Sequence, residues 1–276
     1  MNAPDDADDL RGLHFKLLLG KTGVRVAIGI AVLAAGAGGA VFLGPAIGGA
    51  AALGALLVSL LVVFAVADSR AEDSFFQAYA LQRDLLLTGK SRLPAATPLL
   101  RKGDARYAER LLTGPIAPGL EGRLALYTYE EESTDSRGNR QTSYYRYTVG
   151  LVEVPECAGR IAELYCQRKS GLKALEGLED VFRRSRKRVE LESEALDDRY
   201  EIFAHESQDA TWLRRLFSPT FIVWLTDSAP KKFAFELVDD TLCCYVNGHK
   251  KNTADLDIVC QASAAVAIRL REEALE

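Results

Sequence analysis

An uncharged run of 42 residues, from Val26 to Ala67, constrains this 276-residue chain more than any other feature. One membrane crossing needs about 20 apolar residues. As a single helix the run would extend about 63 Å, roughly twice the hydrocarbon thickness of a bilayer. Gly44 and Pro45 lie near its middle, where residues that interrupt helical hydrogen bonding allow a tight reversal. The run therefore predicts two spans, near residues 25–43 and 46–67, joined as a transmembrane helical hairpin.

The two expected spans differ in apolar strength. The second is dense in leucine and valine and should insert by itself, whereas glycines dilute the first. Small residues spaced about four apart permit close backbone approach between helices in a membrane, although loose composition would also explain them. We expect the hairpin to pack through Gly36, Gly39, Gly44, Pro45 and Gly48.

A secretory signal peptide is the main alternative to the hairpin, because Ala65-Val66-Ala67 resembles a cleavage site. The apolar region of such a peptide spans only about 7–15 residues, far fewer than this run. Basic residues flank the run on both sides, and the turn between the expected spans has none; they are Arg11, Lys16, Lys21, Arg25, Arg70 and Arg83. The positive-inside rule then predicts a multi-pass protein with both termini in the cytoplasm.

Residues 1–24 precede the hairpin. The first dozen, rich in aspartate, are expected to form a disordered acidic tail, and the leucines between Lys16 and Lys21 an interfacial lead-in. Gly20-Lys21-Thr22 resembles the end of a phosphate-binding loop, but Phe15 stands where that motif requires a second glycine. We therefore expect no nucleotide site here.

The remaining chain predicts a helical neck at residues 68–118 and a cytoplasmic α+β domain at 119–276. The neck is expected to contain a helix over 70–88, ended by Gly89, and a second helix from Asp104 to Leu112. Two β-hairpins are expected in the domain, at 123–132 with 142–154 and at 232–238 with 241–247.

Helices and short strands are expected between and after these hairpins. Helices are predicted at 156–168, 172–186 and 208–217, another from Ser218-Pro219, and a last one starting at Asn252 or Thr253; strands are predicted at 188–192 and 199–204. Ser207 is the expected cap of the helix at 208–217. Hairpins interspersed with helices favour an antiparallel sheet with packed helices over a parallel one.

Part of the carboxyl-terminal region resembles a known bacterial family. The matching segments are Val189-Glu190-Leu191-Glu192-Ser193, Tyr200-Glu201-Ile202-Phe203, Asp209-Ala210 and Leu216-Phe217-Ser218-Pro219-Thr220-Phe221. They resemble domain of unknown function 3137, whose members are similar in placing two spans before a cytoplasmic α+β domain. The resemblance covers about the last ninety residues and implies no catalytic residues. It implies the bacterial inner membrane as the location.

The cysteines and histidines suggest metal binding or nucleophilic catalysis, but no recognised sequence motif accompanies them. Cys243, Cys244, His249 and Cys260 contain zinc-type ligands but lack a CxxC pair, and adjacent residues of a strand face opposite ways. We expect one of the two adjacent cysteines in the core and the other near a surface. The odd count of five cysteines indicates a reducing compartment. We predict no metal and no cofactor.

Three other candidate groups have ordinary explanations. Cys260 with His249 and Asp257 would need a base within reach of the thiol, which sequence proximity does not establish. His205 lies between a strand and a helix, a position compatible with catalysis or with solvent exposure. The carboxylates of Glu190, Glu192 and Glu194 alternate along a predicted strand, where they would line an acid/base surface or a solvated face.

A basic cluster is the strongest local electrostatic feature. Its five cations are Arg183, Arg184, Arg186, Lys187 and Arg188. At a membrane such a cluster would attract anionic headgroups, at about 1 kcal/mol per residue. It would also suit phosphates of nucleic acid, but no aromatic platform accompanies it, and the net charge of −4 is unlike that of nucleic-acid-binding domains. A solvated basic helix end is the third interpretation.

The sequence thus predicts a membrane-anchored interaction or regulatory module, with lipids and either a protein or a second copy of the chain as partners. No recognisable catalytic set marks it as an enzyme. A membrane-bound hydrolase using His205 or a cysteine–histidine pair is the first alternative. An oligomeric assembly packed through the glycine-rich spans is the second.

Overall fold

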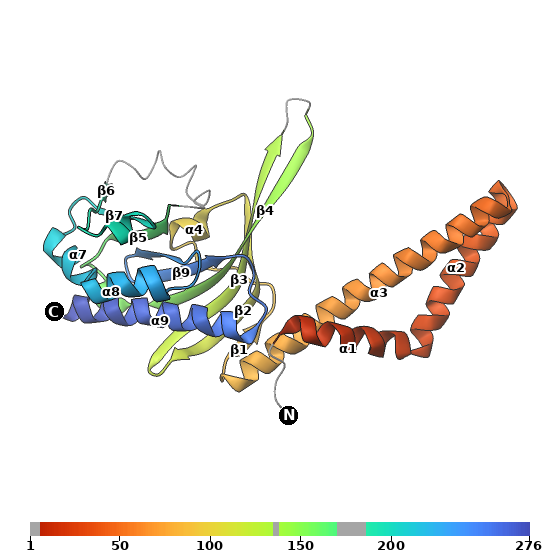
Figure 1. Cartoon of the computed structure of the whole chain (residues 1–276), viewed down its shortest axis with the longest axis horizontal. Coiled ribbons are helices and arrows are strands. Elements are labelled where there is room, and N and C mark those ends of the chain that lie inside the picture. Colours follow the sequence, from red (N-terminus) through yellow and green to blue (C-terminus); the bar gives the residue numbers. More distant parts are fainter. Residues whose placement is uncertain (1–5, 135–137, 170–185) are drawn as a thin grey trace. The chain divides into compact units, whose positions relative to one another are not determined.

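The computed structural model describes residues 6–134, 138–169 and 186–276, which form two compact units. The first unit comprises Met1–Tyr79 with Lys251–Thr253, and the second comprises Ala80–Lys250 with Ala254–Glu276. The first is helical and the second is a sheet with packed helices (Figure 1). The chain is therefore an α+β protein with two long apolar helices near its amino terminus, as the sequence predicts.

Three helices make up the first unit: α1 (Ala7–Gly20), α2 (Thr22–Leu43) and α3 (Pro45–Gln82). The break between α2 and α3 falls at Gly44, whose φ of 99° is a conformation that glycine adopts without strain. Pro45 opens α3, a position where its missing N–H costs no helical hydrogen bond. The predicted reversal at Gly44-Pro45 is confirmed. The helix expected at residues 70–88 is the continuation of α3 as far as Gln82.

The backbones of α2 and α3 approach closely near their junction. A Cβ added at Gly48 would lie 2.6 Å from the Ala40 nitrogen and 2.6 Å from the Gly36 carbonyl oxygen. One added at Gly39 would lie 2.9 Å from the Gly48 Cα. Real Cβ atoms essentially never approach backbone this closely, so α2 and α3 lie against one another at Gly39 and Gly48 without side chains between them.

Helix α1 corrects the expected disordered tail, because the chain is helical from Ala7 onward. Asp6 caps the helix by accepting a hydrogen bond from the Asp8 nitrogen, and the acidic first turn complements the helix dipole. Leu18 is buried against Val63 and Ala67 of α3. The expected lead-in is therefore a helix packed on the hairpin.

Nine strands of the described residues form one antiparallel sheet in the order β1-β2-β3-β4-β9-β8-β5-β7-β6. Their bounds are β1 Leu86–Thr88, β2 Ala105–Ala117, β3 Leu120–Thr134, β4 Arg140–Glu153, β5 Glu163–Arg168, β6 Arg186–Arg188, β7 Tyr200–His205, β8 Ala234–Val238 and β9 Thr241–Asn247. The pairs β3–β4 and β8–β9 confirm the two predicted hairpins. The antiparallel fold class is confirmed with them.

Helices cover both faces of this sheet. One face carries α9 (Thr253–Leu275), which runs along the strands (Figure 1). Gly150 of β4 permits this contact, because a Cβ there would lie 2.1 Å from the Ser263 Oγ of α9. The other face carries α4 (Pro98–Arg101), whose Leu99 and Leu100 belong to the hydrophobic core. The remaining short helices are η1 (Pro155–Cys157), α6 (Glu194–Asp197), α7 (Ala210–Leu216), α8 (Pro219–Val223) and the π-helical turn η3 (Trp224–Ser228).

Two predicted helices are strands in the structure. The segment Asp104 to Leu112 lies largely in β2. A bulge at Glu109 interrupts the alternation of this strand, so its two buried residues, Ala108 and Leu112, are four positions apart, as on one face of a helix. The helix expected at 156–168 is the short turn η1 followed by β5. Both faces of β5 are covered, so its continuous apolar run does not distinguish strand from helix.

Smaller differences concern element ends. The helix expected to reach residue 88 ends at Gln82 and is followed by β1, and the strand expected at 188–192 is β6, which ends at Arg188. Asp209, instead of Ser207, caps α7 by accepting hydrogen bonds from two backbone nitrogens. Ser218 caps α8 as predicted. Most of the helix expected at 172–186 lies outside the described residues.

The close approach at Gly48 generates a matched test. Cysteines introduced as Gly36→Cys and Ala52→Cys should form a disulfide on mild oxidation in membranes, because a Cβ at residue 36 lies 3.2 Å from the Ala52 Cβ. Adding Gly48→Val should abolish this cross-link by forcing the helices apart.

Gly49→Val is the matched control, since a Cβ at Gly49 meets no atom within 4 Å, and the cross-link should persist. Gel mobility of the non-reduced protein reports each result. Equal cross-linking in the two valine variants would contradict the observed pairing of α2 and α3.

Candidate functional site

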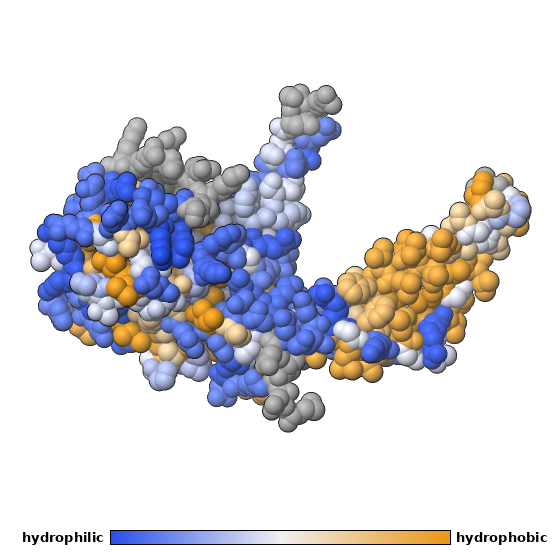
Figure 2. Space-filling model, viewed as in Figure 1, coloured by the Kyte–Doolittle hydropathy of each residue, from blue (hydrophilic) through white to orange (hydrophobic). Residues whose placement is uncertain are grey.

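The apolar helices of the first unit, α2 and α3, form a candidate interaction surface. No residue in the apolar window of α2 is buried, and only 11% of that of α3 is. Leu33 and Phe42 are exposed by 73% and 83%. Figure 2 shows a nearly continuous hydrophobic surface over this helical pair. Both helices are long and apolar enough to cross a membrane.

A polar contact marks the end of this apolar surface. Arg11 of α1 forms an ion pair with Asp68 of α3 at 2.5 Å, and its guanidinium lies 5.5 Å from the centre of the Phe64 ring. The Phe15 ring packs edge-on against Phe64. His14 Nε2 lies 3.2 Å from the Ser74 Oγ. Apolar side chains thus give way to paired charges within a few residues, as at a membrane–water interface.

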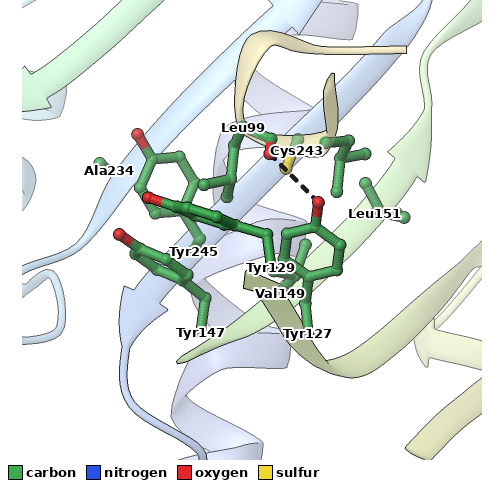
Figure 3. Packing of buried hydrophobic residues seen from close by; sticks show 10 residues of the cluster. Leu99, Tyr127, Tyr129, Tyr147, Val149, Leu151, Ala234, Cys243 and Tyr245 are labelled. Atoms are coloured by element: carbon green, nitrogen blue, oxygen red, sulfur yellow. Dashed lines mark hydrogen bonds between the residues drawn. The ribbon is translucent and has the colours of Figure 1, made fainter. Parts of the chain in front are cut away.

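The second unit contains a cluster of buried tyrosines under α4, which the sequence analysis did not single out. The Tyr129 ring stacks between those of Tyr145 and Tyr147, at centroid distances of 4.8 Å and 6.0 Å. The Tyr127 hydroxyl donates to the Leu99 carbonyl, 3.3 Å away (Figure 3). In the same view the hydroxyls of Tyr129, Tyr147 and Tyr245 lie on one side of the cluster.

A fully buried carboxyl, Glu236, adjoins this cluster. It accepts hydrogen bonds from the Leu99 nitrogen at 3.0 Å and from the Tyr245 hydroxyl at 3.4 Å. Burial raises the pKa of Glu236 to about 7, because removal from water disfavours the charged form more than these hydrogen bonds favour it. Sequence alternation alone does not reveal this group, since a glutamate on a strand usually faces solvent.

The adjacent cysteines occupy opposite faces of β9, as predicted. Cys243 belongs to the core cluster with the tyrosines, whereas Cys244 faces Ser263 of α9. Both are buried, which corrects the expectation that one lies near a surface; α9 covers the second face. Burial raises the pKa of the Cys157, Cys166, Cys243 and Cys244 thiols, which disfavours the thiolate.

His249 is held by polar groups of the sheet. Its Nε2 lies 3.1 Å from the Tyr127 carbonyl oxygen and 3.2 Å from the Thr128 Oγ1, while its Nδ1 lies 3.8 Å from a Glu109 oxygen. A ring nitrogen facing a carbonyl carries the hydrogen and donates it. Asp257 pairs with Arg83 at 2.5 Å. These contacts engage His249 and Asp257 with groups other than the Cys260 thiol.

His205 and the three glutamates occupy the edge of the domain opposite to β1. His205 ends β7 and its Nδ1 lies 2.7 Å from the Ser207 Oγ. Strands β8 and β5 separate β7 from β9, so His205 and His249 do not adjoin the same part of the sheet. Glu190, Glu192 and Glu194 are exposed, and they lie in a loop and in α6 instead of along one strand face.

Three cations of the basic cluster lie on β6, and Arg183 and Arg184 lie outside the described residues. Arg186 is only 10% exposed, because its guanidinium pairs with Glu163 at 2.5 Å and stacks 4.1 Å from the Tyr165 ring. Lys187 donates to two backbone carbonyls, of Glu206 and Gln208. Arg188 is exposed. Two of the described cations thus already have contacts within the domain.

Comparison with known proteins gives limited information. No protein-family model matches the chain, and no curated protein matches it. The crystal structure of the mycobacterial trehalose monomycolate transport factor A, TtfA, is similar over 73% of this chain and 96% of that one, with a TM-score of 0.47 and 13% identity. A similarity at this level carries no functional inference.

Glu236 generates a prediction for the pH dependence of stability. The folded protein holds this proton up to about pH 7, whereas an exposed glutamate releases it near its ordinary pKa of 4.5. The folded state binds more protons between these values, so the free energy of unfolding decreases as the pH rises through that window. The decrease attributable to Glu236 is on the order of 3 kcal/mol.

Glu236→Gln should remove most of this decrease, and Glu190→Gln, at an exposed position, should leave it unchanged. The measurement is the melting temperature of the full chain in lipid nanodiscs at several pH values between about 4.5 and 7. Near-ultraviolet circular dichroism of the tyrosines reports the melting. If the melting temperature fell equally steeply with pH in the wild type and in Glu236→Gln, the Glu236 carboxyl would not be the cause of the decrease in stability.

Proposed function

We propose that this protein is a membrane-anchored module in which α2 and the first part of α3 cross the bacterial inner membrane as a hairpin. The single observation that carries the proposal is the exposed apolar surface of these helices. Among the side chains that the structure describes between residues 26 and 66, fourteen large apolar ones are exposed: Val26, Ile30, Leu33, Val41, Phe42, Ile47, Leu53, Leu56, Leu57, Val58, Leu61, Val62, Phe64 and Val66.

The lengths of the apolar segments support this placement. Residues 26–43 and 45–67 extend about 27 Å and 35 Å as helices, against a hydrocarbon thickness of about 30 Å. The second is long enough to cross with a tilt. Arg25 and Asp68 then lie near the same interface, and α1, with exposed Leu13 and Leu17, lies along it.

Both termini and the sheet domain are assigned to the cytoplasm. The proposal rests on the basic residues at this end of the hairpin, among them Lys16, Lys21 and Arg70, and on their absence from the turn. The five cysteines, all buried thiols without a disulfide, are compatible with a reducing compartment.

The sheet domain is proposed to act as an interaction or regulatory module for a protein partner or a second copy of the chain. The proposal is supported by the position of the domain. A hairpin that fixes a folded domain at a membrane raises the local concentration of that domain around other membrane components. Membership of the family of domain of unknown function 3137 is part of this proposal. Lipid contact by Arg188 and its neighbours also remains a proposal.

Alkaline extraction and cysteine labelling test the anchor and its orientation. The protein should stay in the membrane pellet at high pH and enter solution only with detergent. In spheroplasts, a membrane-impermeant maleimide should label Ala46→Cys, at the turn, and should label Lys231→Cys, in the domain, only after lysis. Both positions are exposed, so a missing label reports the barrier and not burial.

Recovery in the soluble fraction would contradict the anchor. Labelling of Lys231→Cys in intact spheroplasts would contradict the orientation while leaving the anchor in place. Cross-linking of the full chain in native membranes, followed by mass spectrometry, tests the interaction role; a reproducible absence of cross-linked partners and of dimers would contradict it.

A further inference from the structure

A cation-lined groove occupies the start of β2, far along the sheet from the basic strand β6. It has a volume of about 790 Å³, within the range of about 300–1,000 Å³ typical of small-molecule sites. Its lining residues are Lys90, Ser91, Arg92, Leu93, Ala95, Asp104, Ala105, Arg106 and Tyr107. Three of the nine are cations and one is an acid.

The chain builds this groove by pairing a loop segment with β2. Ser91 exchanges two backbone hydrogen bonds with Ala108, at 3.0 Å and 2.8 Å. This bridge fixes Lys90 and Arg92 on either side of Ser91, beside Arg106 of β2. Lys90 is further positioned by Tyr107, whose ring centre lies 3.7 Å from the Nζ.

The acidic groups around the groove are already engaged. Asp104 accepts a hydrogen bond from the Glu132 nitrogen at 2.8 Å. Glu130 accepts from the Tyr107 hydroxyl at 2.9 Å, and Glu131 lies 3.8 Å from the Lys102 Nζ. Among the described residues, none of these contacts joins an acid to a cation that lines the groove. The lining therefore keeps an excess of positive charge.

The cations contact neutral groups instead. Arg106 donates to the Arg101 carbonyl oxygen, and Arg101, next to the groove, donates to the carbonyls of Ala95 and Ala96. The Ser91 Oγ is buried and has no hydrogen-bond partner among the described residues.

We propose that this groove binds a small phosphate-bearing anion, either a soluble phosphate ester or the phosphate of an anionic lipid headgroup. Three cations against one acid match the charge of about −1.5 to −2 on a phosphate monoester better than that of a carboxylate. The forked guanidinium groups of Arg92 and Arg106 suit two oxygens of one phosphate, and Lys90 supplies a third charge. The form with a soluble ester does not depend on the proposed membrane anchor, whereas the form with a lipid headgroup rests on it.

The reactivity of Lys90 tests the proposal in the full chain. With the protein in phosphatidylcholine nanodiscs, glycerol 3-phosphate should slow acylation of Lys90 by an amine-reactive ester, measured by mass spectrometry against exposed Lys231. In a second arm, nanodiscs that contain phosphatidic acid replace the soluble ester. Protection by glycerol 3-phosphate supports a soluble ligand, and protection by phosphatidic acid alone supports a lipid headgroup.

Variants show whether the groove is responsible. Arg92→Ala and Arg106→Ala should each raise the concentration for half-protection about tenfold, which corresponds to about 1.4 kcal/mol, because each removes a hydrogen bond to a charged group. Arg92→Lys with Arg106→Lys should retain protection. The matched control, Arg140→Ala with Arg214→Ala, removes two exposed cations elsewhere and should change nothing. No protection in either arm, or full protection in the alanine variants, would overturn the proposal.

Discussion

The exposed apolar surface of α2 and α3 is the constraint on which the rest of the account depends. Among the described residues, fourteen large apolar side chains between residues 26 and 66 are exposed. Soluble monomeric proteins rarely expose large contiguous apolar patches, which usually mark contact with a membrane or another protein. The glycines at positions 36, 39 and 48 pair the two helices but leave their outer faces uncovered. In the proposed function a lipid environment covers these faces, and the paired charges at Arg11 and Asp68 fit its boundary.

The sheet domain buries its apolar side chains in a core of its own. Its core combines stacked tyrosines with a buried carboxyl, and hydrogen bonds from Leu99 and Tyr245 hold Glu236 in place. Burial raises the pKa of Glu236 in this core, and a separate groove lined by Lys90 and Arg92 lies on the surface of the same domain. Core and groove adjoin the same segment, residues 90–101, which supplies both α4 and the loop beside β2.

Features with a strong local cause could be predicted from the sequence. The reversal at Gly44-Pro45 and the hairpins β3–β4 and β8–β9 follow from turn residues and alternation. Strand β2 could not be predicted in this way, because the bulge at Glu109 places the buried Ala108 and Leu112 four residues apart, as on one face of a helix. The burial of Cys244 and of Glu236 depends on α9 and α4, which reach the sheet from distant parts of the chain. The groove could not be predicted either, because its cations come together only when the segment around Ser91 pairs with β2.

Contact between lipid tails and the hairpin is the central claim, and a photoreactive group near the end of a phospholipid acyl chain tests it directly. After illumination of the full chain in bilayers, mass spectrometry locates the adducts. The account predicts adducts on the outward side chains of residues 26–66, such as Leu33 and Leu61, and none on the sheet domain. Adducts spread over the domain, with the hairpin unmodified, would contradict it.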